Sequence, residues 1–231
     1  MQGKPLPGKI PIWNNLLEHI RLSYPAFTST HHPLAPLTRE VIVERLARAA
    51  PPRDARDLHA VALPDGARVT HAAVLVPLVC SATEMNILLT QRTAHLDDHA
   101  SQISFPGGRV EPSDLNREDT ALRETGEEIG LRRSAITILG RLPDYEIPSG
   151  FRITPVVGSI EPPLELKPDS FEVAGVFEAP LAYFLNPENY QRRQYHFRGR
   201  HRHYMAIPYQ GRYIWGATAG MLYDLCRMLK D

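Results

Sequence analysis

Cysteine is scarce in this sequence, and the chain has no paired-cysteine motif. The 231 residues include two cysteines, Cys80 and Cys226, which lie far apart. This usage argues against a disulfide scaffold and against a zinc site built on cysteine pairs. Since proteins that need no disulfides are typical of reducing compartments, we expect a cytoplasmic setting.

The sequence also has no net charge and no long apolar run. Lys+Arg and Asp+Glu both number 26, so the formal net charge is zero. That balance argues against bulk electrostatic binding to nucleic acid or to an anionic membrane. No apolar run approaches the length of a membrane span, and no N-terminal stretch has the apolar core of a signal peptide. We therefore expect neither a nucleic-acid nor a membrane partner, while a local basic pocket for a small anionic ligand stays open.

The first part of the chain reads as an extension before the main domain. This extension spans residues 1–69, and residues 1–35 are rich in proline and aromatics, with a short helical pattern at Asn14–Leu22. Thr38 is placed to cap a helix over Arg39–Ala49. Apolar and proline-rich residues in the first 35 positions suggest a homodimer contact.

The remainder, residues 70–231, mixes strands and helices without strict alternation. Pro155 is expected at a sheet edge or bulge, and Ala217–Leu229 reads as a closing helix. This mixture predicts an α/β fold with a mixed sheet between helices. The expected strands are His71–Val79, Asn86–Thr90, Gln102–Phe105, Thr137–Leu142, Phe151–Ile160, Val173–Phe177 and a meander of Tyr195–Phe197, Tyr204–Ile207 and Arg212–Trp215.

The stretch from Gly107 to Leu131 concentrates acidic residues. If Arg117–Ile129 is a helix, its three glutamates share one face, because positions three and four apart are helix neighbours. Those glutamates are Glu124, Glu127 and Glu128. Their mutual repulsion is relieved when a hard cation such as Mg²⁺ or Mn²⁺ binds oxygen ligands among them. The alternative is a solvated amphipathic helix with charged pairs.

This stretch resembles the Nudix box, the signature of Nudix hydrolases. The box has a glycine, an acid six residues on, and then Arg-Glu-hydrophobic-x-Glu-Glu-x-Gly-hydrophobic, and Gly108, Asp114 and Arg123–Leu131 occupy those places. Asp114 replaces the usual glutamate, Thr125 replaces the hydrophobic residue, and one extra residue lies between Gly108 and Arg123. The resemblance implies a Nudix α/β/α sandwich and a metal-dependent hydrolase of a diphosphate linked to another group.

The resemblance also assigns roles to residues of the box. It makes Glu124 and Glu128 metal ligands, with Glu127 as a third ligand or as the general base. The carbonyl of Gly107 is a further ligand, and Arg123 orients the glutamates rather than touching substrate. The cofactor is Mg²⁺ or Mn²⁺.

The general base and the substrate contacts are less closely specified. Besides Glu127, the loop acids Glu146 and Glu178 are available as bases. An anionic substrate needs cations, and Arg92 and Arg109 flank the double glycine. The remaining candidates are Phe151 or Tyr145 for stacking on adenine, and the basic run Arg198–His203 for a further phosphate.

A second resemblance lies just upstream of the box. Leu88–Arg92 (LLTQR) followed by Phe105–Gly108 (FPGG) resembles the signature of the coenzyme A pyrophosphatase branch. This implies a coenzyme A-like substrate, hydrolysed, with or without an acyl group, to 3′,5′-ADP and (acyl-)4′-phosphopantetheine. However, Asp97 stands where the signature has arginine, and Ser101 where it has glycine.

An aspartate there replaces a phosphate contact with repulsion. Two alternatives therefore stay open. One is hydrolysis of another nucleoside diphosphate derivative, such as ADP-ribose, a dinucleotide or an oxidised nucleotide. The other is a non-catalytic nucleotide-sensing module.

Overall fold

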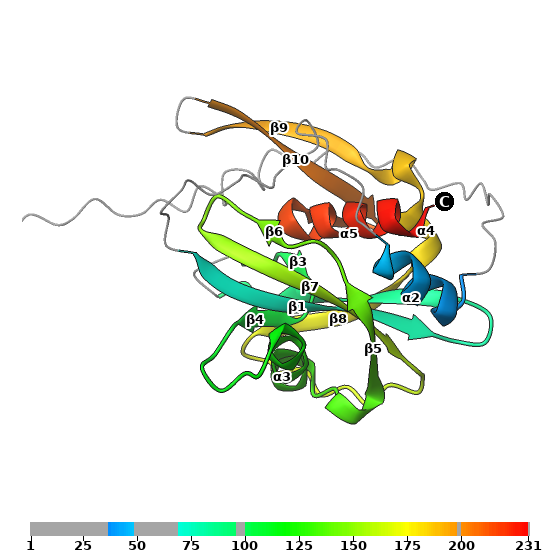
Figure 1. Cartoon of the computed structure of the whole chain (residues 1–231). Coiled ribbons are helices and arrows are strands. Elements are labelled where there is room, and N and C mark those ends of the chain that lie inside the picture. Colours follow the sequence, from blue (N-terminus) through cyan, green and yellow to red (C-terminus); the bar gives the residue numbers. More distant parts are fainter. Residues whose placement is uncertain (1–36, 49–68, 96–99, 198–199, 231) are drawn as a thin grey trace, which may run out of the picture. The chain divides into compact units, whose positions relative to one another are not determined.

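The computed structural model describes residues 37–48, 69–95, 100–197 and 200–230 (Figure 1). All of them belong to the unit that runs from Pro33 to Asp231. The predicted helix at Asn14–Leu22 and the branch position Asp97 lie outside the described residues. None of the helices within those ranges is both long and apolar enough to cross a membrane.

An eight-stranded mixed sheet forms the centre of this unit. Its main path runs β3-β2-β1-β7-β5, with β4 paired to β1, β6 to β7 and β8 to β2. Only the β1–β7 pair is parallel. The strands are β1 (Thr70–Cys80), β2 (Met85–Arg92), β3 (Ile103–Ser104), β4 (Gly107–Arg109), β5 (Ile136–Arg141), β6 (Tyr145–Glu146), β7 (Phe151–Ile160) and β8 (Val173–Pro180).

Helices cover both faces of this sheet (Figure 1). Because side chains alternate along a strand, Leu75 of β1 packs toward α3 (Arg117–Ile129) and its neighbour Val76 packs toward the opposite face. The opposite face is covered by α2 (Arg39–Ala47), α4 (Leu181–Leu185) and α5 (Gly216–Leu229). This arrangement confirms the predicted α/β/α sandwich with a mixed sheet. Helix α2 begins where predicted, since the Thr38 hydroxyl accepts a bond from the Val41 amide.

A second, three-stranded sheet has the predicted meander order. It consists of β9 (Gln191–Phe197), β10 (Arg200–Tyr209) and β11 (Arg212–Trp215), all antiparallel. Two short 3-10 turns, η1 (Arg133–Ala135) and η2 (Pro187–Asn189), complete the elements. Figure 1 shows this sheet beside α5, and β10 and α5 contact each other.

Pro155 does not lie on an edge strand, the first of the two places predicted for it, and the register irregularity of the β5–β7 pair falls between Ile138 and Gly140 of β5. Pro155 is in β7, which runs between β1 and β5 near the middle of the sheet. A proline is tolerated there because its missing donor falls where the neighbour of β7 changes from β5 to β6. Its carbonyl still accepts a bond from the Leu142 amide at 2.9 Å, in the connection between these two strands.

Candidate active site

Helix α3 begins and ends at the residues that the sequence predicted. The Asn116 side chain caps it by accepting from the Asp119 amide at 2.8 Å, and Asp119 accepts from the Leu115 amide at 3.0 Å. The helix ends at Gly130, which has a left-handed φ of 71° suited to glycine. These caps fix the register of the last turns, which carry Glu124, Glu127 and Glu128.

Arg123 binds the loop that precedes α3. Its Nε and Nη2 donate to the two oxygens of Asp114 at 2.9 and 3.0 Å. We call this bidentate pair the arginine clamp. The Asp114 side chain, only 3% exposed, also accepts from the Thr120 hydroxyl and the Glu111 amide. Hydrogen bonds from Arg123 hold the pKa of Asp114 well below its usual range and raise the pKa of Arg123.

The clamp also reaches two of the predicted metal ligands. Nη1 of Arg123 donates to Glu124 Oε1 at 3.1 Å and to Glu127 Oε2 at 3.0 Å. Nη2 donates to the carbonyl of Arg109 at 3.1 Å. The arginine thus connects the helix to β4, as expected of a residue that orients the glutamates.

Two of the three departures from the box pattern, Thr125 and the extra residue, have local explanations. Thr125 is fully buried, but its hydroxyl donates to the Ala121 carbonyl at 2.6 Å, so no polar group is left unpaired. The extra residue lies in the loop between β4 and α3, where insertion costs little.

Glu128 is the most deeply buried of the three box glutamates. Its side chain is 8% exposed, against 18% for Glu124 and 60% for Glu127. It accepts from the Gly107 amide at 3.3 Å and lies 4.0 Å from Nη1 of Arg92. Burial raises the pKa of Glu128 to about 7, despite these two contacts. Burial also raises the pKa of Glu124.

The double glycine leaves room for these carboxylates. A Cβ on Gly108 would lie 2.4 Å from the carboxylate of Glu124, and one on Gly107 would lie 2.4 Å from the Ala73 carbonyl oxygen. Any side chain at either position would therefore clash with the helix or with β1. The Gly107 amide contacts Glu128; its carbonyl as a metal ligand stays a prediction.

The structure adds an acid that the sequence argument did not select. After the larger effect of burial, the charges of Glu127 and Glu172 contribute to the raised pKa of Glu124, and the charges of Glu172 and Glu124 contribute to the raised pKa of Glu128. We call Glu124, Glu128 and Glu172 the acid cluster.

Glu172 is delivered by the segment that crosses the end of α3. Within this segment the Asp169 amide donates to the Glu128 carbonyl at 2.9 Å, and the Thr93 amide donates to the Glu172 carbonyl at 2.9 Å. No periodic pattern marks such a return, and only its position directly before β8 at Val173 could have drawn attention to Glu172.

The two acids expected on loops lie in strands instead, Glu146 in β6 and Glu178 in β8, and have partners there. Glu146 pairs with Arg152, with Nη2 at 2.6 Å from its carboxylate. Glu178 accepts from the Asn86 side chain at 3.0 Å, within the β2–β8 pairing.

The predicted substrate contacts are placed as follows. Arg92 is adjacent to Glu128, and its Nε is buried without a hydrogen-bond partner in the part of the chain that the structure describes. Arg109 lies over the ring of Phe151, with 5.3 Å from its guanidinium carbon to the ring centre.

Tyr145 is 1% exposed and packs against Gly220 of α5, where a Cβ would lie 2.1 Å from the Tyr145 hydroxyl. Stacking of Tyr145 on adenine was therefore a wrong expectation, because the ring is part of the core.

The basic run and the branch positions are only partly described. Arg198 lies outside the described residues, and β10 begins at Arg200. Ser101 has a φ of 58°. This backbone conformation favours glycine, the residue that the branch signature has at this place.

The acid cluster fits a divalent cation by its chemistry. The donors are carboxylate oxygens, which Mg²⁺ and Mn²⁺ prefer. Two of them have raised pKa values because they are buried beside other acids, and a cation there would reverse both shifts. Across the described ranges no three acids, histidines or cysteines are already grouped as a metal cage. Arg123 instead holds Glu124 and Glu127.

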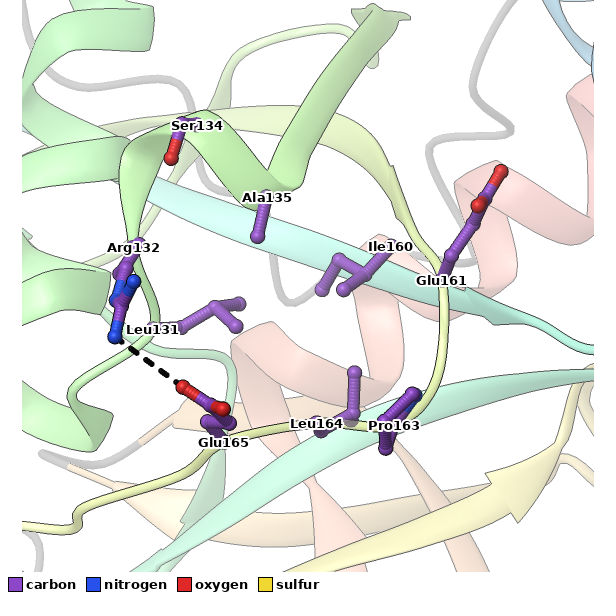
Figure 2. Close-up of a pocket in the computed structure, with 9 residues that line it drawn as sticks. All are labelled: Leu131, Arg132, Ser134, Ala135, Ile160, Glu161, Pro163, Leu164 and Glu165. Atoms are coloured by element: carbon purple, nitrogen blue, oxygen red, sulfur yellow. Dashed lines mark hydrogen bonds and ion pairs between the residues drawn. The ribbon is translucent and has the colours of Figure 1, made fainter.

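A depression of about 300 Å³ lies apart from these residues (Figure 2). Leu131, Ile160 and Leu164 form its apolar lining, and Arg132 pairs with Glu165 at its rim at 3.3 Å. None of the predicted site residues lines it, so it is separate from the acid cluster.

Comparison with known proteins agrees with the box. The family model described as the NUDIX domain matches residues 69–197. The protein named Uncharacterized Nudix hydrolase NudL from Yersinia enterocolitica is 41% identical over 160 residues, covering 69% of this chain and 81% of the relative. The protein of the same name from Pectobacterium atrosepticum is 40% identical over 178 residues, covering 73% and 90%.

A crystal structure of a C. elegans Ap4A hydrolase binary complex aligns with 24% identity and a TM-score of 0.41. It covers 49% of this chain and 81% of that one. A likeness of that degree adds no weight. Nudix hydrolases use divalent metal ions to hydrolyse nucleoside diphosphates linked to another group. The family match and the two relatives show that this chain belongs to the Nudix hydrolase family.

Proposed function

We propose that this Nudix hydrolase cleaves the diphosphate of coenzyme A or of its thioesters. The products are 3′,5′-ADP and 4′-phosphopantetheine or its acyl form. The supporting observation is the position of Arg92, the last residue of the LLTQR motif, whose guanidinium lies 4.0 Å from Glu128. The branch motif and the box thus meet at one point.

We assign the cation, Mg²⁺ or Mn²⁺, to Glu124 and Glu128, with the carbonyl of Gly107 as a further ligand. Glu127, the third ligand or general base by resemblance, takes an accessory position in this assignment because its side chain is 60% exposed. Glu172 joins these residues as a ligand or base, because its charge acts on both buried glutamates. When bound, the cation supplies neutralising charge to the diphosphate and lowers the pKa of its water.

The remaining residues act on geometry and on the substrate. Arg123 keeps Glu124 and Glu127 in place through its clamp to Asp114. Arg92, whose side chain is 28% exposed, donates to the diphosphate oxygens through its guanidinium. Arg109 lies over Phe151, so the pair presents a cation backed by an aromatic face to the same anion.

A second candidate is another nucleoside diphosphate derivative, such as ADP-ribose or a dinucleotide. Asp97 favours it, since the branch signature has an arginine there. Ser101 favours coenzyme A, because it keeps the backbone conformation of the signature glycine.

One assay of substrate preference distinguishes the two candidate functions. Coenzyme A, acetyl-coenzyme A, ADP-ribose, NADH and a diadenosine polyphosphate are incubated with Mg²⁺ or Mn²⁺ and with EDTA, and products are resolved by chromatography. We expect metal-dependent release of 3′,5′-ADP from coenzyme A at the highest kcat/KM. A higher kcat/KM for ADP-ribose or a dinucleotide would transfer the assignment to the second candidate.

A further inference from the structure

An exposed aromatic side chain lies directly beside the acid cluster. Phe171 is 63% exposed, and among the described residues only Val43 and Leu115 are other exposed large hydrophobic side chains. Phe171 precedes Glu172, so their Cα atoms lie about 3.8 Å apart. Phe171 is absent from both core clusters, so packing in the interior does not explain it.

The backbone that presents this ring is fixed. The Phe171 carbonyl accepts from the hydroxyl of Thr93 at 2.7 Å, and its amide donates to the Asp169 carboxylate at 2.9 Å. Thr93 itself is buried at 6% exposure. An aromatic side chain on a fixed backbone loses little conformational entropy when a ligand packs against it.

A second aromatic ring stands next to Phe171. The centre of the His95 ring lies 4.8 Å from that of Phe171, with the planes tilted by 59°. His95 is also exposed, and it follows Arg92, the predicted diphosphate contact, by three residues. The two rings therefore come from the same two chain segments that deliver Arg92 and Glu172 to the acid cluster. Exposed aromatic rings beside a nucleotide site are suited to stacking on a planar base.

We propose that Phe171, supported by His95, stacks on the base of the nucleotide substrate. This role rests on the proposed hydrolase function, but not on coenzyme A, since every nucleoside diphosphate derivative carries a base. It also supplies the aromatic contact that buried Tyr145 cannot make. Phe151 is less suited to it because Arg109 already lies over its ring.

The test compares a ligand with a base and one without. Dissociation constants of ADP and of inorganic diphosphate are measured by calorimetry with Mg²⁺ for the wild type, Phe171→Ala and Phe171→Trp. We expect Phe171→Ala to weaken ADP binding about tenfold and to change diphosphate binding less than about twofold, because one stack is lost. Phe171→Trp should bind ADP at least as tightly as the wild type. Leu115→Ala, which removes another exposed large hydrophobic side chain (Leu115 is 87% exposed), is the matched control.

Two results would overturn the stacking role. One is an unchanged ADP affinity in Phe171→Ala, and the other is equal weakening of ADP and diphosphate. In the coenzyme A assay the expected counterpart is a raised KM with kcat largely kept. If coenzyme A is cleaved and Phe171→Ala leaves KM unchanged, the stacking role fails while the hydrolase assignment stands. If ADP binding depends on Phe171 but coenzyme A is not cleaved, the substrate assignment fails instead.

Discussion

The acids at the arginine clamp and those in the acid cluster have opposite electrostatic surroundings, although α3 contributes to both. Asp114 has its own cation in Arg123, and its pKa is lowered. Glu124 and Glu128 are buried beside another acid, and their pKa values are raised. Arg92 approaches Glu128 only to 4.0 Å. Arg123 also donates to Glu124 at 3.1 Å, but it is shared with Asp114 and Glu127. A carboxylate with its own cation serves the fold, whereas carboxylates that outnumber the cations beside them are suited to an external one.

The largest effect should follow from removing the most buried acid. We expect Glu128→Gln to lower kcat by about a thousandfold, because the cation would lose a ligand worth several kcal/mol to the transition state. Thermal unfolding should stay close to that of the wild type. The control is Glu165→Gln, which removes an exposed acid at the depression of Figure 2. A near-normal kcat in Glu128→Gln would show that the metal assignment is wrong.

Glu172 should come second. We expect Glu172→Gln to lower kcat by about ten- to a hundredfold, in the range typical of a general base or an accessory ligand. Glu178→Gln, which removes an acid of β8 that is bonded to Asn86, is the comparison. Equal activity of the two variants would remove Glu172 from the acid cluster.

Breaking the clamp should act mainly on stability. Asp114→Asn replaces charged hydrogen bonds to Arg123, and we expect a loss of about 2 kcal/mol in the free energy of unfolding at pH 7. The folded-state pKa of Asp114 is depressed, so its contribution is present above the unfolded pKa of about 3.9 and is lost as pH falls through the lower folded pKa.

Urea titrations of the wild type and Asp114→Asn at several pH values check this sign. Their difference in unfolding free energy should be constant near neutral pH and should shrink below about pH 4. A difference that grew toward acid pH would contradict the clamp.

The smallest catalytic effect is expected at Glu127. Its side chain is 60% exposed and pairs with Arg123, so Glu127→Gln should reduce kcat only a few-fold. A loss as large as that of Glu128→Gln, measured under the same saturating Mg²⁺, would restore Glu127 as the general base.

The sequence could predict those parts of the fold and of the site that local patterns specify. The bounds of α3 follow from local chemistry, namely the Asn116 cap and Gly130, and β7 follows from its apolar run. Glu172 could not be found this way, because its approach to Glu128 depends on a segment that returns across the end of α3. The positions of Pro155 and Tyr145 likewise depend on neighbouring strands and on Gly220, which no local pattern specifies.

The most direct test of the acid cluster is metal binding itself. Mn²⁺ affinity is measured by electron paramagnetic resonance at neutral pH for the wild type, Glu128→Gln and Glu165→Gln. We predict that Glu128→Gln weakens Mn²⁺ binding at least about tenfold while Glu165→Gln binds as the wild type does. Equal Mn²⁺ affinity in all three proteins would contradict the assignment of a cation to these carboxylates.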